Sequence, residues 1–588
     1  MTLLQDLSAI VGAAFAREDI DAGLGEVRVS DRPDLAQFQC NGALGAAKAL
    51  KTNPRALAEK IAVHLRAEPA IAEVTIAGPG FLNLTLTDDY LVERLGRAVD
   101  STGWQSETSE TIVLDYGGPN VAKPLHVGHL RAAIIGESLK RILRLTGAKV
   151  IGDVHLGDWG LQMGQLISEL ALRAPELIYF DPDAAGPFPE DPPVSLKDLE
   201  DMYPVASAAC KADPERRELA RKATFDLQEG RAGYRALWHH FVTLSKAAIK
   251  DDYDALGVSF DLWKGEADAD LFIAPMVEAL EQKGLVEESD GARIIRVERD
   301  DDRKTVPPIM LITSEGSVGY HTTDLATIVD RMESQNPDRI LYVVDQRQAL
   351  HFEQVFRASA MAGYLGEDRL EHLGFGTMNG KDGKPFKTRE GGVLKLQDMV
   401  AMVETRAHER LVESGMTKGL DASEIAKVAR QVGVAALKFA DLSNPRTSDY
   451  IFDLDRFTSF EGKTGPYLQY ACVRIQSILN RLQEGGKDTD LGQGAALVIT
   501  KDEERDLILC LMSFSEVIKN AYEKRMPHLL AEHAFTLAQT FSRFYAACRV
   551  TDEGDDKVRA SRTRLLTIVR EQLGLVLDLL GIEIPDRM

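Results

Sequence analysis

Cysteine is scarce in this chain of 588 residues, and its distribution excludes two classes of protein. No two cysteines form a Cys-x-x-Cys pair, and their number is odd. Such spacing argues against a disulfide framework and against a zinc ribbon, so we expect reduced, mostly buried thiols. The cysteines are Cys40, Cys210, Cys472, Cys510 and Cys548.

Long apolar runs are also absent. No stretch of about 18 apolar residues occurs, so we expect no membrane-spanning helix. Residues 1–19 lack an early cluster of lysine and arginine, include Asp6, and fit an amphipathic helix better than a secretory signal. We therefore expect a cytoplasmic protein.

Basic residues are fewer than acidic residues in this chain. The chain has 69 lysine and arginine residues against 91 aspartate and glutamate residues, which gives a formal net charge of −22. Taken alone, this balance disfavours a nucleic-acid partner, because such a chain binds RNA only through local basic surfaces. The length predicts several domains.

Residues 111–147 are the most informative segment. They predict a buried strand, a turn rich in glycine and proline, and a helix that opens with His126-Val127-Gly128-His129. A helix N-terminus after a parallel strand favours phosphate. The two histidines share one helix face and could bind phosphate oxygens during nucleotidyl transfer, while Gly128 leaves room for an adenine on the backbone. The alternative is a purely structural histidine pair.

The order of predicted elements indicates the fold. Strands alternate with helices, which predicts an α/β, doubly wound parallel sheet of the Rossmann-like kind. The expected strands are 111–115, 149–153, 293–297, 308–313, 340–344 and 372–376. The expected domains are an N-terminal α+β domain (1–108), a catalytic domain (109–400) with an insertion at about 174–290, a helical connecting region (401–462) and a C-terminal all-α helical bundle (463–588).

Two further loops have the composition of a nucleotide site. Residues 380–392 place Lys384, Lys387 and Arg389 between glycines, which suits closure over a triphosphate. A solvated turn is the alternative. In residues 155–164, Gly157 allows the backbone to approach a ligand and Asp158 could orient a polar group. A tight strand–helix turn would explain the same glycines.

Tyr320 and Asp324 lie four residues apart at the predicted start of a helix. A guanidinium group needs a carboxylate that accepts two parallel hydrogen bonds, and it gains from an aromatic neighbour. The pair could supply both. By position alone, Asp324 is equally explained as an acid that the helix dipole favours.

Several of these strings resemble one family. Residues 119–129 are similar to the HIGH signature of class I aminoacyl-tRNA synthetases, and more closely to its version in arginyl-tRNA synthetases. The His155-Leu156-Gly157-Asp158-Trp159-Gly160 string, the Tyr320–Asp324 string, residues 342–352, residues 464–471 and the ending 584–588 resemble the same family, in order along the chain. Residues 464–471 are similar to the start of its DALR-type anticodon-binding domain.

The resemblance implies an activity and a set of residues. The family uses ATP to convert L-arginine to arginyl-adenylate, with Mg²⁺ on the phosphates, and then esterifies the terminal adenosine of tRNA(Arg). The basic loop looks like a degenerate KMSKS motif that lacks its second lysine, for which Lys123 would compensate. We expect no metal ligands in the chain and a monomer. Implied catalytic residues are His126, His129, Lys123, Lys384, Lys387 and Arg389; implied ATP-binding residues are His126, Gly128, His129, Gly157, Asp158 and Lys387; implied arginine-binding residues are Asn120, Tyr320, Asp324, Gln348 and, as a further candidate, Asp115.

Candidate tRNA contacts lie near both ends of the chain. Residues 37–43 resemble the family's tRNA-contacting N-terminal domain, and aromatic residues interleave with arginines in the last helices. Aromatic rings stack on unpaired bases and arginines meet phosphates. The alternatives are a helix start with a buried phenylalanine and, at the other end, a core stripe beside a solvated face. The candidates are Phe38, Gln39, Asn41, Tyr467, Tyr470, Phe544, Tyr545, Arg549, Arg562 and Arg564.

Two other functions share part of this pattern. A small-molecule nucleotidyltransferase can share the His-x-Gly-His string, but it would normally lack a long helical C-terminal domain. A non-catalytic tRNA-binding paralogue should have lost the HIGH string or the basic loop, and both are present. The sequence is therefore identified as a member of the arginyl-tRNA synthetases.

Overall fold

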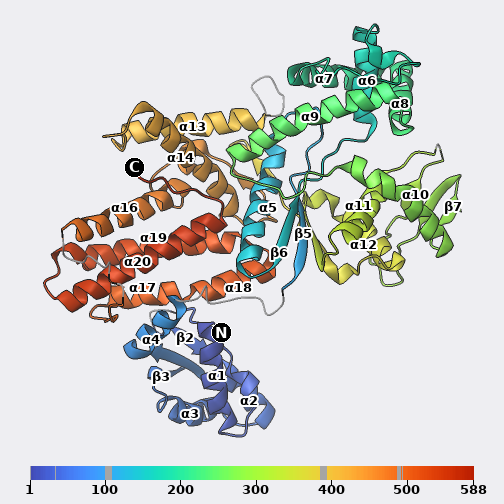
Figure 1. Ribbon diagram of the computed structural model, residues 1–588. Coiled ribbons are helices and arrows are strands. Elements are labelled where there is room, and N and C mark those ends of the chain that lie inside the picture. Colours follow the sequence, from blue (N-terminus) through green and yellow to red (C-terminus); the bar gives the residue numbers. More distant parts are fainter. Residues whose placement is uncertain are drawn as a thin grey trace. The chain divides into compact units, whose positions relative to one another are not determined.

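The computed structural model describes residues 2–32, 35–99, 109–314, 316–384, 394–485, 492 and 494–588. The chain divides into two compact units. One unit is the continuous segment Thr108–Ser459, and the other combines Met1–Glu107 with Phe460–Met588. Figure 1 labels the elements of both.

A four-stranded parallel sheet forms the centre of the unit Thr108–Ser459. Its strand order is β11-β10-β5-β6, and all three neighbouring pairs are parallel. The chain passes from β5 to β6 on one side and later adds β10 and β11 on the other, so the switch point lies between β5 and β10. Ligands of such sheets bind at the carboxyl ends of the strands at this point. The strands are β5 Thr111–Tyr116, β6 Lys149–Asp153, β10 Arg339–Val343 and β11 Leu370–His372.

Helices cover both faces of this sheet, as the sequence predicted. Val113 and Tyr342 point to the face where they pack with residues of α11 (Tyr320–Ser334) and α12 (Ala349–Ala362). Tyr116, of opposite parity to Val113, points toward α5 (Val127–Leu145), which contacts β5 and β6. Figure 1 shows α5 alongside these strands. The approach is close, because a Cβ on Gly136 of α5 would lie 2.3 Å from the ring of Tyr116.

A mostly helical insertion and a small antiparallel sheet separate β6 from β10. The sheet has the order β7-β8-β9. Two runs predicted as strands, 293–297 and 308–313, belong to it and not to the parallel sheet. Asp290 and Gly291 both have positive φ, as a type I′ hairpin requires, so β7 and β8 pair antiparallel. The elements are α6 Leu161–Arg173, η2 Ile178–Phe180, α7 Leu196–Ala212, α8 Pro214–Gln228, α9 Ala232–Ala255, α10 Glu266–Gln282, β7 Glu287–Ser289, β8 Ala292–Ile295 and β9 Ile309–Ile312.

The helices that follow β11 complete this unit. Helices α13 and α14 pack against each other and both contact α5. The segment up to residue 459 therefore belongs with the catalytic sheet. The elements after β11 are β12 Met378–Asn379, α13 Leu396–Glu413, α14 Ala422–Leu442, β13 Tyr450–Ile451 and α15 Leu454–Phe457. Two short helices, η3 Gln346–Gln348 and η4 Glu367–Arg369, lie between β10 and β11.

The second unit joins the two ends of the chain. Its N-terminal part is the predicted α+β module, with an antiparallel sheet of order β1-β2-β4-β3. Its C-terminal part is a helical bundle whose helix α17 packs against α4. Arg505 on α17 donates a hydrogen bond to the backbone oxygen of Leu86 and pairs with Asp88. The elements are α1 Leu3–Ala16, η1 Ala22–Gly25, β1 Val27–Val29, β2 Phe38–Cys40, α2 Gly42–Leu50, α3 Pro54–Leu65, β3 Ile71–Ala77, β4 Phe81–Leu86, α4 Asp88–Val99, α16 Gly465–Glu484, α17 Asp502–Met512, α18 Phe514–Lys524, α19 His528–Ala547, η5 Val550–Asp552 and α20 Asp556–Leu579.

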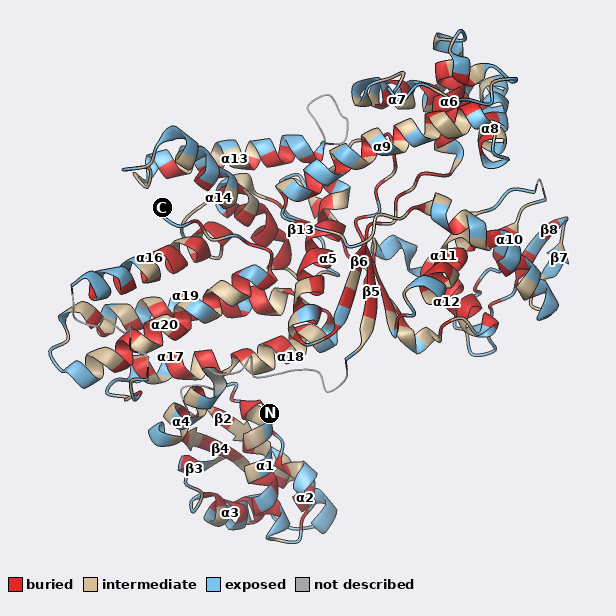
Figure 2. Ribbon diagram, in the orientation of Figure 1, coloured by how far each residue is buried: buried red, intermediate tan, exposed pale blue. Residues whose placement is uncertain are grey.

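Buried residues are concentrated between the parallel sheet and its helices in one unit and inside the helical bundle in the other (Figure 2). All five cysteines are free in the structure; four are buried and Cys510 is half-buried, which confirms that the thiols are mostly buried. In the part of the chain that the structure describes, no helix has the length and apolar character needed to cross a bilayer.

Candidate active site

The two histidines of the HIGH turn (residues 119–129) form a reciprocal helix cap. His126 is the N-cap of α5, and its Nδ1 accepts a hydrogen bond from the backbone N–H of Gly128 at 3.0 Å. The Nδ1 of His129 accepts the backbone N–H of His126 at 3.1 Å. The ring centroids lie 4.0 Å apart. The helix start thus fixes both rings before any ligand binds.

These contacts also fix where each ring carries its proton. An Nδ1 that accepts a backbone N–H has no proton, so the neutral ring carries it on Nε2. Burial, with a smaller effect of the Lys123 charge, lowers the pKa of His126. Burial, then His126 and Lys123, lower the pKa of His129 to about 3. Both rings are therefore neutral at pH 7 and offer Nε2–H donors to a ligand.

Gly128 leaves room for the ring of His126. A Cβ at this position would lie 2.7 Å from Cε1 and 2.8 Å from Nδ1 of His126. Gly128 is itself exposed, and the expectation that an adenine lies on its backbone stays a prediction.

We expect Gly128→Ala to lower the rate of adenylate formation by about tenfold, since moving the His126 ring off its rotamer costs up to about 1.5 kcal/mol. The thermal midpoint should change little, because the gain of about 1 kcal/mol for alanine over glycine in a helix offsets most of this cost. ATP–pyrophosphate exchange and a melting curve check both. If the Gly128→Ala variant keeps the parental exchange rate and melting curve, the position of the His126 ring does not contribute to adenylate formation.

Backbone hydrogen bonds join the HIGH turn to the segment that directly follows the basic loop (residues 380–392). The N–H of Val127 donates to the oxygen of Leu394 at 3.1 Å, and the N–H of Leu396 donates to the oxygen of Leu125 at 2.9 Å. Lys384, at the other end of the loop, is exposed. Lys387 and Arg389 lie outside the described residues, so their roles stay predictions.

Asn120 and Gly157 lie together at the ends of β5 and β6. The N–H of Gly157 donates to the oxygen of Pro119, and the N–H of Val121 donates to the oxygen of Gly157, both at 3.0 Å. A Cβ on Gly157 would lie 2.4 Å from Oδ1 of Asn120. The glycine is therefore needed where the Asn120 side chain enters the site.

Acidic side chains gather beside this turn. Glu266 begins α10, and its N–H donates to the oxygen of Leu156 at 2.9 Å, which places α10 at the end of β6. Burial, with smaller effects of Asp158 and Asp324, raises the pKa of Glu266 to about 7. Burial raises the pKa of Asp158 to about 6, and its Oδ1 accepts the N–H of Ala267 at 3.0 Å. Three carboxylates thus interact without an arginine or lysine between them in these contacts.

Glu266 was not predicted from the sequence. The signal available in the sequence is the Gly265-Glu266 pair, in which an acidic residue follows a glycine at the start of a helix. Its charge interaction with Asp324, which is 58 residues away along the chain, depends on the packing of α10 against α11.

Asp324 and Tyr320 lie in the first turn and a half of α11. One carboxylate oxygen of Asp324 contacts Nε2 of His351 at 2.5 Å, and the side chain of Asp324 is 27% exposed. Tyr320 is 76% exposed. Gln348 lies just before α12 and is exposed. Asp324 therefore joins Asp158 and Glu266 in one acidic cluster, whereas Tyr320 and Gln348 are open to solvent.

Asp115 already has an internal guanidinium partner. Its Oδ2 accepts a bond from Nη2 of Arg331 at 2.6 Å, and the same nitrogen contacts Asp153 at 2.7 Å. All three side chains are buried. This pairing argues against the expectation that Asp115 reads a substrate guanidinium, and it makes Glu266 the better candidate.

The N-terminal tRNA candidates divide by burial. Phe38 on β2 is buried and packs in the core of its module, as the alternative interpretation expected, so its ring is not available to stack on a base. Gln39 donates a hydrogen bond from Nε2 to Oδ1 of Asn83 at 2.9 Å. Asn41 is exposed at the start of α2.

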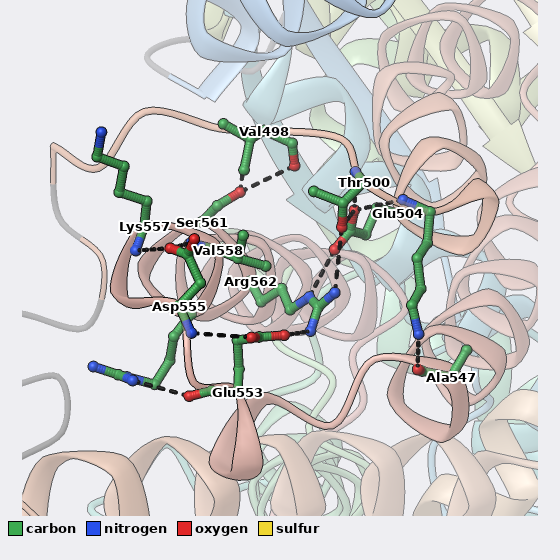
Figure 3. Close-up of polar contacts among 12 residues, drawn as sticks. Val498, Thr500, Glu504, Ala547, Glu553, Asp555, Lys557, Val558, Ser561 and Arg562 are labelled. Atoms are coloured by element: carbon green, nitrogen blue, oxygen red, sulfur yellow. Dashed lines mark hydrogen bonds and ion pairs between the residues drawn. The ribbon is translucent and has the colours of Figure 1, made fainter.

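Two C-terminal candidates are also buried. Phe544 is fully buried. Arg562 is 4% exposed, and Figure 3 shows its guanidinium between two carboxylates. Its Nε lies 2.7 Å from Oε1 of Glu504, which is itself fully buried, and its Nη1 lies 2.5 Å from Glu553. Arg562 therefore holds α20 to α17 and the loop before α20, which corrects the expectation that it meets a phosphate. Surface positions remain at Tyr467, Tyr470, Tyr545, Arg549 and Arg564, of which Arg549 is exposed and the others half-buried.

The residues at the HIGH turn suit phosphate better than a metal ion. Within the described ranges, no three His, Cys, Asp or Glu side chains gather in a way that would hold a metal. The groups at the turn are two neutral N–H donors and the Lys123 ammonium, which bind phosphate oxygens.

Family models match three parts of the chain. The model "tRNA synthetases class I (R), catalytic domain" matches residues 94–454. The "DALR anticodon binding domain" matches residues 468–588, and the "Arginyl tRNA synthetase N terminal domain" matches residues 2–86. Together they extend over both units.

Full-length relatives agree. The chain is 53% identical to the arginine–tRNA ligase of Hyphomonas neptunium and 51% identical to that of Maricaulis maris, with 100% of each chain covered. The arginyl-tRNA synthetases of Plasmodium falciparum (TM-score 0.81, 23% identity) and Thermus thermophilus (TM-score 0.78, 22% identity) share the fold over 100% of both chains. With these matches added to the HIGH turn and the acidic cluster, the chain belongs to the class I arginyl-tRNA synthetase family.

Proposed function

We propose that this chain, as an arginine–tRNA ligase, forms arginyl-adenylate at the carboxyl ends of β5 and β10. The proposal rests on one observation: a site suited to phosphate and a site suited to a guanidinium lie in the same unit, Thr108–Ser459. Neutral histidine donors and Lys123 lie at the start of α5, and the carboxylates Glu266 and Asp324 lie at the starts of α10 and α11. The first group suits a triphosphate and the second suits a guanidinium.

In the first step, the carboxylate of arginine attacks the α-phosphate of ATP and pyrophosphate leaves. The Nε2–H groups of His126 and His129 donate to the phosphate oxygens on which negative charge increases in the transition state. Because both rings are already held by the helix start, their donors need no reorientation. Lys123 adds a positive charge beside them. Mg²⁺ bound to the phosphates of ATP would neutralise the leaving pyrophosphate.

Arginine is recognised by charge and by shape. A guanidinium has five donors in a planar fork, and two carboxylates can accept from both edges of it. Asp324 has one oxygen on His351, which leaves the other to accept from the substrate. Asn120 binds the α-amino or carboxylate end, and Tyr320 and Gln348 shape the pocket.

In the second step, the adenylate esterifies the terminal adenosine of tRNA. Because the net charge is −22, tRNA binding requires local basic and aromatic positions. In the C-terminal helices these are Tyr467, Tyr470, Tyr545, Arg549 and Arg564.

The direct test is ATP–pyrophosphate exchange with arginine, with and without tRNA(Arg). We expect exchange that depends on arginine and increases with tRNA. Tight tRNA binding without exchange under either condition would support a non-catalytic paralogue. If ATP–pyrophosphate exchange requires a different small molecule as nucleotidyl acceptor and does not occur with arginine, the protein is a small-molecule nucleotidyltransferase.

Arg549→Ala should weaken tRNA binding by about 3- to 10-fold at physiological salt and reduce the salt dependence by about one counterion, as the loss of one phosphate contact does. Arg296→Ala, at an exposed arginine in the other unit, is the matched control. Binding isotherms at several salt concentrations measure both. Equal effects of the two changes would remove Arg549 from the interface.

We further propose that the protein is a monomer and acts in the cytoplasm. Light scattering at micromolar concentration tests the first statement, since a mass near 64.7 kDa is expected. A mass of twice this value would contradict it.

A further inference from the structure

Helix α7 of the insertion contacts the lysine of the HIGH turn. The ammonium nitrogen of Lys123 lies 4.4 Å from the centre of the Tyr203 ring. This distance lies within the range of a cation–π interaction. Tyr203 comes from a segment 80 residues further along the chain, so the contact depends on how the insertion packs and not on local geometry.

The same helix also contacts Lys395, the N-cap of α13. Glu200, one turn before Tyr203, pairs with the Nζ of Lys395 at 2.8 Å. Lys395 lies between the two residues whose backbones bond to the HIGH turn. Lys123, Glu200 and Lys395 line one small cavity of about 20 Å³ together with Asp252 of α9. Helix α7 is thus fixed at two points beside the phosphate site.

Tyr203 also lies near the arginine side of the site. Partial desolvation of its hydroxyl, with smaller effects of Glu266 and Tyr203, raises the pKa of Tyr320. Tyr203 therefore contacts Lys123 and also interacts electrostatically with Tyr320.

We propose that Tyr203 is a positioning residue that holds the Lys123 ammonium at the phosphate site. This inference rests on the proposed role of Lys123 in adenylate formation. A lysine has a flexible four-carbon stem and loses rotamer entropy when it is fixed. A ring that restrains the ammonium before ATP binds reduces this loss in the transition state. The ring and not the hydroxyl performs this function.

The test measures arginine- and tRNA-dependent ATP–pyrophosphate exchange with the full-length protein. Tyr203→Leu should lower kcat by about 3- to 30-fold, the range of one cation–π contact, and change the KM for arginine less than twofold. Tyr203→Phe, which keeps the ring, should stay within twofold of the parent. Tyr203→Met replaces the leucine variant if that variant does not fold.

The decisive measurement repeats the substitution in Lys123→Met. If Tyr203 acts through Lys123, Tyr203→Leu changes kcat less than twofold in that background. A full effect there, or a phenylalanine variant as slow as leucine, would overturn the proposal. The matched control is Tyr234→Leu, which removes a comparable contact with Arg231 at 4.1 Å in the same insertion and should leave kcat unchanged. If Lys123→Met alone keeps parental exchange, the role of Lys123 is wrong, whatever Tyr203 does.

Discussion

Asp324→Asn should reduce the preference for arginine over lysine by about 10²–10³-fold. The parent should reject lysine by on the order of 10⁴ without editing, because a point charge leaves carboxylate oxygens unpaired. Asparagine keeps the size of the side chain but loses its charge, and breaking a buried charged pair costs about 3–5 kcal/mol. The measurement is kcat/KM for arginine and for lysine in both proteins. Unchanged discrimination would show that another acid reads the guanidinium.

Glu266→Gln tests the second carboxylate through its pH dependence. Because the pKa of Glu266 is raised to about 7, the side chain is largely protonated below pH 7 and charged above it. The guanidinium needs the charged form, so kcat/KM for arginine should rise with pH up to about 7 in the parent. The glutamine variant should lose this rise. Asp268→Asn, two residues along α10, keeps an acceptor for the N–H of Gly265 and should retain the parental profile.

Substitution of either HIGH histidine should slow adenylate formation. His126→Ala or His129→Ala should lower its rate by about 10²–10³, as loss of an oxyanion donor does, with little change in arginine binding. ATP–pyrophosphate exchange gives the rate, and calorimetry gives the affinity for arginine. Parental turnover in either variant would make the pair structural.

His126 needs a separate control, because it also caps α5. Removing a cap costs about 1 kcal/mol of stability. His126→Asn restores a good cap but not the Nε2–H donor, so it should melt like the parent and remain slow. If the asparagine variant recovers full rate, the cap alone explains the effect of alanine.

The sequence predicted the local parts of the site well. The HIGH turn could be predicted because strand, turn and helix are contiguous, and the capping contacts of His126 and His129 span only three residues. The parallel sheet followed from the alternation of strands and helices. The antiparallel pairing of β7 with β8 was missed, although the Asp290-Gly291 turn was a signal for it.

Burial and long-range pairing could not be predicted in the same way. From the sequence, Arg562 is expected at a basic surface. In the structure it is paired with the buried Glu504, which lies 58 positions earlier in the chain. Asp115 reads as a free acid at the end of a strand, but Arg331 reaches it from α11. In each case the sequence gives the charge and only tertiary packing gives the partner.

The two-part composition of the unit Met1–Glu107 and Phe460–Met588 has a consequence for synthesis on the ribosome. At about 5–20 residues per second, the N-terminal module waits roughly 20–70 s while the intervening unit is translated, and then waits further for α17 to emerge. During this interval it must remain folded on its own core, which includes Leu7, Phe15 and Leu84. The contact of Arg505 with Leu86 then closes the unit late, after the catalytic segment has left the exit tunnel. A pause in translation once the catalytic segment has emerged would therefore leave a complete catalytic unit and an N-terminal module that still lacks its C-terminal partner.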